Sequence, residues 1–452
     1  MKKQPMLSVS GVRGIVGDTL TPETVIKYVQ PFAQQRVGKT IVVGGDPRVS
    51  HRILRPLVKA TIMASGASCI DIGIAPTPTV QLVTERLKAA GGIAITASHN
   101  PIQWNGLKFV GSDGLFLSEQ EIEELFRLAE LDEHHYANWK ELGEEQHYNR
   151  AIDDHLEAIF QLPYIDPELI RKKRFRIALD CVNGAGGVIV PRLLEELGCT
   201  VYGINLETSG VFAHTPEPVP QNLTQLAALV KEKKADLGIA VDPDVDRLAL
   251  IGNDGNPLGE EYTLALAVKF VLSKKLGPVV INLSTSRVIE DIVQYYNCLL
   301  YRTKVGEVHV ARKMREVQAV IGGEGNGGVI LPDVHLGRDA PVGIALILQL
   351  MAETGERITE LKQSLPQYYI LKDKVSLQEV SPEKVLEHFT RKYGDARLDF
   401  TDGLRIDRPD SWIHLRKSNT EPIVRIIVEA ATPEIAWRIL QETKTEINNL
   451  KI

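Results

Sequence analysis

The sequence predicts an α/β protein with three related α/β domains in tandem and a smaller C-terminal α+β domain. A strand, a polar or glycine-rich loop, a helix and a second strand follow one another three times, beginning near residues 40, 176 and 279. In each copy a cysteine stands at the start of the second strand, at Cys69, Cys199 and Cys298. Alternating strands and helices are typical of parallel α/β sheets, and their repetition indicates related domains. After about residue 370 the pattern changes to paired strands followed by a helix.

Charged and turn-forming segments predict the domain boundaries. A charged stretch around residues 144–147 ends the first domain, and the turn at 253–255 ends the second. Pro366 follows an amphipathic helix predicted over 355–364 and ends the third. We therefore expect domains at 1–150, 151–255, 256–370 and 371–452, which suits a chain long enough for several domains.

Composition and charge exclude several classes of protein. Hydrophobic residues make up 44% and charged residues 24% of the chain, which is ordinary for a globular protein, and the net charge of −6 argues against nucleic-acid binding. No apolar run has the length of a membrane span or follows the basic start as in a signal peptide, so we expect a cytoplasmic protein without a membrane partner. The cysteines, Cys181 included, lack CxxC spacing, and we expect reduced, buried thiols rather than a zinc site or disulfides.

Residues 7–17 form a glycine-broken extended segment that carries Arg13 between Gly11 and Gly14. Glycine lets the backbone approach another group closely, so Arg13 is either a surface arginine in a turn or a contact for an anion. The segment alone favours the surface arginine.

Residues 96–101, Thr-Ala-Ser-His-Asn-Pro, follow an apolar strand predicted over 91–95. Pro101 ends regular structure, because proline has no N–H and disfavours helix in the residue before it. Ser98 is therefore expected on a loop at a strand end, where α/β proteins place their chemistry. A lone serine there is more often an ordinary turn residue, so the other loops must decide between the two interpretations.

Three aspartates, Asp242, Asp244 and Asp246, follow a buried strand predicted over 237–241 and precede another over 248–251. Held close in a folded loop, they are expected to raise one another's pKa. A bound hard cation removes that cost, and carboxylate oxygens suit Mg²⁺. The loop is not an EF-hand, because its sixth position is an arginine rather than glycine. A solvated acidic turn is the alternative, and the apolar flanks favour the metal site.

The segment 323–328, Gly-Glu-Gly-Asn-Gly-Gly, matches the dinucleotide pattern G-x-G-x-x-G. Residues 329–332 continue as extended chain, so no helix N-terminus would face a pyrophosphate and we reject nucleotide binding. We expect an irregular loop whose Glu324 and Asn326 contact sugar hydroxyls, since a carboxylate and an amide can accept from and donate to a diol. A plain turn is an equal alternative.

A polar loop over 416–422 lies between strands predicted over 412–415 and 423–429, and a helix is predicted to begin at Thr432 and Pro433. An arginine can grip phosphate with two hydrogen bonds, and loop hydroxyl, amide and N–H groups add donors. No Walker pattern is present, so a nucleoside triphosphate is not implied, and a solvated polar loop is the alternative. The expected phosphate-binding residues are Arg416, Ser418, Asn419, Thr420 and Arg425.

Together the four loops resemble those of the α-D-phosphohexomutase superfamily, which includes phosphoglucosamine mutase, phosphomannomutase and phosphoglucomutase. The resemblance covers nearly the whole chain in the family's order and spacing, and the segments 96–101, 242–247 and 416–422 carry it. It implies four domains around a central cleft and an intramolecular phosphotransferase of the isomerase class. The implied reaction interconverts hexose 6-phosphate and hexose 1-phosphate through a phosphoserine enzyme and a 1,6-bisphosphate.

The resemblance also implies roles for individual residues. Ser98 would carry the phosphate, and a phosphoserine oxygen would join the three aspartates in binding Mg²⁺. Glu324 would hold sugar hydroxyls, and the loop at 416–422 would hold the non-reacting phosphate. The residues expected around the transferring phosphoryl group are Arg13, His99, Arg247 and Lys108, the last a candidate general acid or base. The expected partners are a phosphosugar substrate and hexose 1,6-bisphosphate, as activator or intermediate, in a monomer or homodimer.

Two positions depart from the commoner family pattern, because Asn326 and Gly328 stand where many relatives have serine and histidine. That histidine is a proposed acid or base, so proton transfer here would fall to Lys108, His99 or another group. The loop resembles archaeal-type phosphoglucosamine and phosphomannose mutases, and residues 302–306 resemble the phosphoglucosamine branch. The resemblance thus favours phosphoglucosamine mutase, with phosphomannomutase or phosphoglucomutase as the alternative.

Two other classes compete with a mutase. A phosphatase with an aspartyl nucleophile also has Asp-x-Asp after a strand, but it explains neither the Ser98 loop nor the C-terminal loop. A catalytically silent sugar-phosphate-binding protein would not need Ser98, the three aspartates and Lys108 together.

Overall fold

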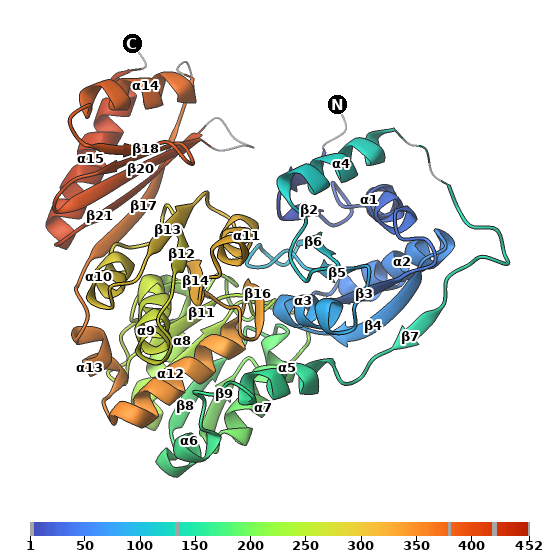
Figure 1. The fold of residues 1–452 in the computed structure, drawn as a ribbon, viewed down its shortest axis with the longest axis horizontal. Helices are drawn as coiled ribbons and strands as arrows, with labels where there is room; N and C mark the ends of the chain where they lie inside the picture. The colour runs from blue at the N-terminus through green and yellow to red at the C-terminus, as the bar shows by residue number, and fades with distance from the viewer. Residues whose placement is uncertain (1–3, 132, 134, 378–380, 418–422, 451–452) are drawn as a thin grey trace.

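The computed structural model describes residues 4–131, 133, 135–377, 381–417 and 423–450, which form four sheets with their helices (Figure 1). The first three sheets mix parallel and antiparallel strands, and the fourth is antiparallel throughout. The predicted architecture, three α/β domains followed by a smaller α+β domain, is confirmed.

The first sheet has the strand order β1-β2-β6-β5-β3-β4-β7. Its centre is parallel, with β3 between β4 and β5, and β6 then runs antiparallel to β5. The strands are β1 (Met6–Ser8), β2 (Gly11–Ile15), β3 (Thr40–Gly45), β4 (Ser68–Ile74), β5 (Gly91–Ile95), β6 (Trp104–Gly111) and β7 (Glu145–His147). The helices are α1 (Pro22–Gln34), α2 (His51–Ala64), α3 (Thr77–Arg86) and α4 (Glu119–Glu130).

The second sheet has the order β11-β10-β8-β9, and β11 alone runs antiparallel. Its strands are β8 (Arg176–Asp180), β9 (Thr200–Ile204), β10 (Leu237–Val241) and β11 (Leu248–Ile251). Its helices are α5 (Ala151–Phe160), α6 (Pro167–Lys173), α7 (Gly186–Glu196) and α8 (Thr224–Lys233), with a short 3₁₀ turn at Pro220–Asn222.

The third sheet has the order β13-β12-β14-β15-β16, with a parallel half and an antiparallel half. Its strands are β12 (Val279–Asn282), β13 (Leu300–Thr303), β14 (Ile321–Glu324), β15 (Gly328–Leu331) and β16 (His335–Arg338). Its helices are α9 (Glu260–Lys274), α10 (Val288–Tyr295), α11 (Glu307–Val317), α12 (Ala340–Thr354) and α13 (Ile358–Gln363).

The fourth sheet has the order β17-β21-β20-β19-β18 and is covered by two helices. Thr432 caps α15 by accepting from Ile435 N–H, with proline at the first helical position, as predicted. The strands are β17 (Tyr369–Ser376), β18 (Arg397–Asp399), β19 (Leu404–Asp407), β20 (Ser411–Lys417) and β21 (Ile423–Ala430), and the helices are α14 (Pro382–Lys392) and α15 (Pro433–Asn449).

The first three sheets share one local topology. Each has a central parallel strand, β3, β8 or β12, and a parallel neighbour, β5, β10 or β14, that turns into an antiparallel strand. The segments 96–103, 242–247 and 325–327 are these equivalent connections. The loops that the sequence analysis selected at 96–101, 242–247 and 323–328 therefore occupy the same place in three related domains.

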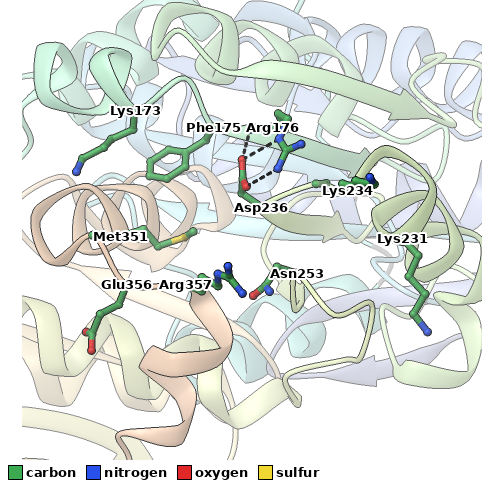
Figure 2. Close-up of a pocket in the computed structure, with 12 residues that line it drawn as sticks. Lys173, Phe175, Arg176, Lys231, Lys234, Asp236, Asn253, Met351, Glu356 and Arg357 are labelled. Atoms are coloured by element: carbon green, nitrogen blue, oxygen red, sulfur yellow. Dashed lines mark hydrogen bonds and ion pairs between the residues drawn. The ribbon is translucent and has the colours of Figure 1, made fainter.

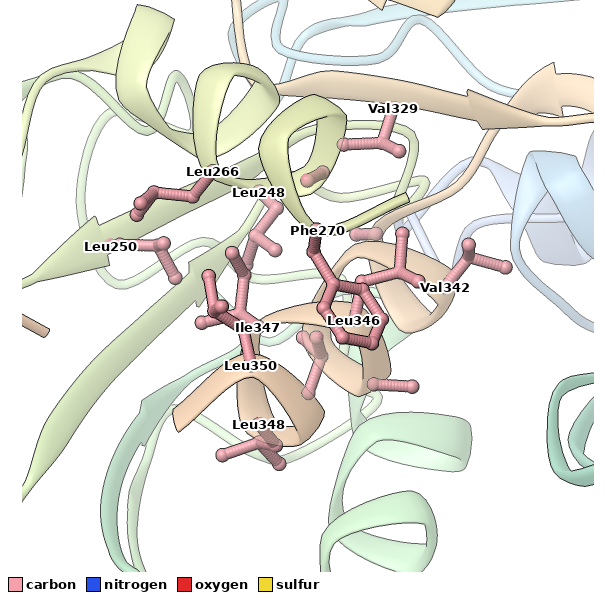
Figure 3. Packing of buried hydrophobic residues seen from close by; sticks show 14 of the residues in the cluster. Leu248, Leu250, Leu266, Phe270, Val329, Val342, Leu346, Ile347, Leu348 and Leu350 are labelled. Carbon is pink, nitrogen blue, oxygen red and sulfur yellow. The ribbon is translucent and has the colours of Figure 1, made fainter. Parts of the chain in front are cut away.

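The second and third domains share one hydrophobic core, whereas the first and fourth have their own. Figure 3 shows its centre, where Leu346 and Ile347 of α12 lie close to Phe270 and Leu266 of α9 and to Leu248 of β11. The continuous apolar contact makes these two domains a single packing unit, because separating them would expose the buried face of α12. The first and fourth domains, each with its own core, are attached to this unit.

Two local predictions differ from the structure. Gly355, at φ 73°, ends α12 in the left-handed conformation, so the helix predicted over 355–364 begins only at Ile358. All four cysteines are free, but only Cys69 and Cys181 are buried. Cys199 and Cys298 are half-buried just before β9 and β13.

Among the described helices, none combines the length and apolarity that crossing a bilayer requires.

Candidate active site

Ser98 lies on the connection between β5 and β6, at the carboxyl end of β5. Its φ of 49° is in the left-handed region, which a serine seldom adopts. Its N–H donates to Thr96 Oγ1 at 2.9 Å, which helps to hold this conformation. Its hydroxyl donates to Asp242 Oδ2 at 2.9 Å and lies 3.3 Å from His99 Nδ1. The predicted phosphorylation site thus meets the aspartate loop of the second domain.

Arg48 holds the Ser98 loop, and the sequence analysis did not single it out. The side chain is fully buried in the loop after β3, where Asp46 pairs with it at 3.2 Å and also accepts from Thr96 Oγ1 at 2.5 Å. Burial raises the pKa of Asp46, against the opposing effects of Arg48 and Thr96. The guanidinium donates to the carbonyl oxygens of Ser98, Asn100, Pro101 and Trp104.

Asp242, Asp244 and Asp246 are fully buried between β10 and β11, with oxygens within 4.8 Å of one another. Asp244 Oδ1 and Asp246 Oδ1 are buried and accept no hydrogen bond from the described residues. Buried carboxylate oxygens without a partner are costly, and a divalent cation between them would remove that cost. An all-carboxylate donor set suits Mg²⁺, so these residues fit the ion that the sequence implied.

Lys108, on β6, is buried, and its ammonium group forms ion pairs with two of the aspartates. Its Nζ lies 2.7 Å from Asp244 Oδ2 and 3.2 Å from Asp246 Oδ2, and Thr77 Oγ1 donates to Asp244 Oδ2 at 2.6 Å. Burial favours a higher pKa for Asp244, but Lys108 and Thr77 outweigh it and the pKa lies below its usual value. Burial lowers the pKa of Lys108, the two aspartates raise it, and the aspartates prevail. Lys108 is therefore protonated.

The mutual effect expected among the aspartates sets the direction of the pKa shift for only one of them. Burial, followed by the charges of Asp246 and Asp244, raises the pKa of Asp242 well above its usual value. Burial and the charge of Asp244 also raise the pKa of Asp246, but Arg338, Lys108 and Arg247 together bring it below the usual value. The net pKa of Asp244 and of Asp246 is therefore lowered, because cations outweigh the repulsion between the carboxylates.

A cavity of about 360 Å³ lies among these loops and is lined from all four domains. This is the central cleft that the resemblance implied. The side chains from the first and second domains include Arg13, His99, Lys108, Glu217 and Arg247. Those from the third and fourth include Glu261, Asn282, Glu307, Glu324, Asn326, Arg338, Lys372, Arg416 and Arg425.

Arg13 and Arg247 bring positive charge to the cavity beside His99. Arg13 lies on β2, donates to Asn100 Oδ1 at 3.1 Å and lines the cavity, which favours the anion contact over a surface arginine in a turn. Arg247 lies 3.4 Å from Glu217 Oε1. Burial, then Arg247 and Arg13, lowers the pKa of His99 to about 2, so its ring is neutral at physiological pH.

Arg416 and Arg425 are direct partners across β20 and β21, and both line the cavity. Like charges opposite each other destabilise a sheet, so an anion between them would be favourable. Asp402 forms an ion pair with Arg416, with 2.9 Å between Oδ2 and Nε. The other residues expected to bind phosphate, Ser418, Asn419 and Thr420, lie outside the described residues.

The comparisons with known proteins agree with this geometry. Residues 6–134, 153–255, 259–369 and 372–445 match, in order, alpha/beta/alpha domains I, II and III and the C-terminal domain of phosphoglucomutase/phosphomannomutase. The chain belongs to the phosphoglucomutase/phosphomannomutase family. It is thus a phosphohexomutase by family, in the isomerase class, and the aspartyl phosphatase alternative is wrong.

Two curated relatives of this phosphohexomutase are each 38% identical to it. One, a "Probable phosphoglucosamine mutase" of Methanopyrus kandleri, aligns over 96% of this chain and 95% of its own length. The other, a "Phosphoglucomutase/phosphomannomutase" of Thermococcus kodakarensis, aligns over 95% of this chain and 96% of its own. A solved structure of a phosphoglucomutase/phosphomannomutase family protein from Burkholderia thailandensis is 25% identical, with TM-score 0.85, and covers 98% of both chains.

The third-domain loop of this phosphohexomutase is shorter than expected. Glu324 is the last residue of β14 rather than part of an irregular loop, and only Gly325, Asn326 and Gly327 connect β14 to β15. Since β15 is extended, the rejection of nucleotide binding stands. The Glu324 carboxylate accepts from Asn282 at 2.7 Å, from Gly306 N–H at 2.9 Å and from Arg338 at 2.7 Å. These contacts hold it in position at the cavity wall.

Arg338 joins the aspartate loop at 242–247 to the third domain, and the sequence alone does not single it out. It lies at the end of β16, 2.6 Å from Asp246 Oδ2, 2.7 Å from Glu324 and 3.1 Å from Glu307. Burial alone would lower the pKa of Arg338. The surrounding carboxylates raise it by more, so the pKa lies well above its usual value. The sequence offered one signal, a charged Arg338–Asp339 pair between an extended run and an apolar helix. That signal does not reveal which carboxylates Arg338 contacts.

A second cavity, of about 530 Å³, lies at the amino end of β8, at the opposite end of the second sheet's parallel strands from the aspartate loop (Figure 2). It is lined by Phe175 and Arg176, at the start of β8, and by Lys231 and Lys234, near the end of α8. Figure 2 shows Arg176 paired with Asp236, at 3.0 Å. The lysines stand at the C-terminal end of a helix, where cations offset the helix dipole. None of the predicted site residues lines this cavity.

Proposed function

We propose that this phosphohexomutase interconverts glucosamine 6-phosphate and glucosamine 1-phosphate through phosphoserine at Ser98 and a 1,6-bisphosphate intermediate. The observation that carries the proposal is the 2.9 Å contact of Ser98 Oγ with Asp242, next to His99 and the cavity that His99 lines with arginines from all four domains. A nucleophile beside a cation site and under several guanidinium groups is what phosphoryl transfer requires.

The proposed reaction exchanges one P–O bond for another in each half. A sugar hydroxyl attacks the phosphorus of phosphoserine, the bond to Ser98 Oγ breaks, and a bisphosphorylated sugar forms. After the intermediate reorients, Ser98 Oγ attacks its other phosphate and regains a phosphoryl group. One proton leaves the attacking hydroxyl and one reaches the departing oxygen in each transfer. Lys108 and His99, which both line the cavity, are the proposed carriers of these protons.

Mg²⁺ is the proposed metal, held by Asp242, Asp244, Asp246 and a phosphoserine oxygen. When bound, it would neutralise charge on the phosphoryl oxygens. Arg13 and Arg247 would surround the same phosphoryl group, since both line the cavity beside His99. Hexose 1,6-bisphosphate is the proposed activator, because it can phosphorylate Ser98 in the resting chain.

The remaining site residues are proposed to hold the sugar. Glu324 and Asn326 would contact its hydroxyls, and the phosphate that does not react would lie between Arg416 and Arg425. The residues proposed with them, although outside the described part of the chain, are Ser418, Asn419 and Thr420. We also propose domain bounds of 1–150, 151–255, 256–370 and 371–452, a cytoplasmic monomer or homodimer, and no nucleic-acid or membrane partner.

Glucosamine phosphate is the proposed sugar because of the Asn326 loop and the 302–306 segment, and one relative at 38% identity carries the phosphoglucosamine mutase name. The second candidate is phosphoglucomutase or phosphomannomutase activity, which the other relative's name favours. The test is kcat/KM with glucosamine, glucose and mannose 6-phosphates. A tenfold preference for glucose or mannose phosphate, about 1.4 kcal/mol, would overturn the choice of sugar. Binding of all three without turnover would instead indicate a silent sugar-phosphate-binding protein.

A further inference from the structure

Glu261 is a buried carboxyl group in the wall of the central cavity that the proposed reaction does not use. It is the second residue of α9 and is 8% exposed. Its Oε2 accepts from Ser286 N–H at 2.9 Å, and its Oε1 is buried with no hydrogen-bond partner among the described residues. An acidic residue in a first turn favours a helix, but that does not explain a buried oxygen without a donor.

The carboxyl group lies directly against the loop that is expected to hold the sugar. A Cβ atom at Gly325 would stand 2.1 Å from both Glu261 oxygens, so only glycine at this position leaves room for them. Gly325 follows Glu324 in the chain, and both line the cavity. Glu261 therefore reaches the cavity beside the proposed sugar-binding residues.

Glu261 also differs in charge balance from the other glutamates of the cavity. Glu307 and Glu324 pair with Arg338 at 3.1 and 2.7 Å, and Glu217 pairs with Arg247 at 3.4 Å. No ion pair within 4.0 Å is formed by Glu261 with any described residue, since nearby Lys372 pairs with Glu260 at 2.7 Å. Glu261 Oε1 thus has neither a hydrogen-bond donor nor an ion-pair partner among the described residues, although the charge of Lys372 acts on the group from nearby.

We propose that Glu261 binds the protonated amino group of a hexosamine phosphate and so sets the preference of the cavity for an amino sugar. The inference rests on the proposed mutase function and names the residue that would select its substrate. A hydroxyl in place of the ammonium could donate a hydrogen bond to Oε1 but would bring no positive charge to stabilise the ionised form of the carboxyl group. A site built for a charged donor discriminates strongly against a ligand that lacks it.

Proton release provides a readout that a merely structural role would not affect. Burial raises the pKa of Glu261 to about 8, with Glu429 and Glu260 acting in the same direction and Lys372 and Ser286 N–H against it. The free carboxyl group therefore holds its proton at pH 7, and a bound ammonium would displace it. In the Ser98→Ala background, calorimetry at pH 7 in two buffers of different ionisation enthalpy should show up to about one more proton released by glucosamine 6-phosphate than by glucose 6-phosphate.

Glu261→Gln should remove this difference in proton release. In the enzyme with Ser98 intact, it should lower kcat/KM for glucosamine phosphate by about 10- to 100-fold and for glucose phosphate by less than about threefold. Glu232→Gln is the control, because it removes a carboxylate that pairs with Lys233 and does not line the cavity. It should leave kcat/KM for both sugars unchanged.

Equal proton release by the two sugars, or equal losses of kcat/KM in Glu261→Gln, would overturn the inference. The calorimetric arm needs no turnover and retains Glu261, so it decides even if Glu261→Gln does not fold. Absence of turnover with every sugar phosphate in the wild type would contradict the proposed function instead, and the two failures are therefore distinguishable.

Discussion

The hydroxyl of Ser98 lies 2.9 Å from Asp242 Oδ2, although 144 positions separate the two residues in the chain. Ser98 lies in the loop after β5 of the first domain, and Asp242 follows the equivalent strand, β10, of the second. The repeated topology of the domains thus brings the serine hydroxyl and the aspartate loop to the same point.

Ser98→Ala should reduce mutase turnover to below about a thousandth of the wild-type rate, because loss of a covalent nucleophile leaves binding alone. Intact-mass and peptide analysis should find one phosphate on Ser98 in the wild type and none in the variant. Ser273→Ala, at the far end of α9, is the matched control and should keep full activity. Substantial turnover by Ser98→Ala would remove the phosphoserine from the mechanism.

Asp244→Asn should weaken Mg²⁺ binding by at least about 10- to 100-fold, since it removes a ligand charge while keeping the side-chain shape. EDTA should stop turnover, and added Mg²⁺ should restore it. Asp236→Asn changes an aspartate at the opposite end of the second sheet, where it pairs with Arg176, and should leave Mg²⁺ binding unchanged. Full activity after EDTA treatment would show that the aspartates serve no metal.

Arg48→Met should destabilise the protein by about 3–5 kcal/mol, because it leaves Asp46 buried without its ion pair. It should also lower kcat more than it raises KM, since the Ser98 loop loses the donor to its carbonyl groups. Thermal melting and steady-state kinetics check both effects. Arg52→Met, at an exposed arginine in the first turn of α2, should change neither, and equal behaviour of the two variants would contradict the positioning role.

Arg416→Lys should lower kcat/KM by about 1.5–3 kcal/mol in free-energy terms, because lysine keeps the charge but loses the bidentate grip. The same cradle would serve both orientations of the intermediate, so both directions of the reaction should be affected. The phosphate content of Ser98 should not change, since Arg416 lies in another domain. An unaltered kcat/KM in both directions would mean that the fourth domain does not hold the substrate.

His51 should make the protein less stable as the pH falls below about 6.5. It is buried at the start of α2, and neither ring nitrogen has a hydrogen-bond partner among the described residues. Burial, with Arg55 and Lys59 adding to it, lowers its pKa to about 4. The unfolded chain therefore binds a proton that the folded chain does not, which costs up to about 1.4 kcal/mol per pH unit between 6.5 and 4. Melting temperatures from pH 7 to 5 should fall less steeply for His51→Gln than for the wild type. Identical slopes would contradict the lowered pKa.

The sequence by itself determined the fold class, because strand and helix periods, glycine and proline are local signals. It placed the strand before Ser98, the extended run after Gly328 and the cap at Thr432 where the structure has them. It also selected three loops that prove to be equivalent connections in three related sheets. Such signals depend on neighbours within a few residues, so a single sequence carries them.

Only the tertiary structure decided which charges meet. Arg48 is an ordinary loop arginine in the sequence, and its four carbonyl partners appear only when β3 and β5 pair. Arg338 reaches Asp246 across 92 positions, and Lys108 reaches Asp244 across 136, which reverses the pKa direction expected for two of the aspartates. Burial and long-range charge are properties of packed domains, and no local pattern of residues encodes them.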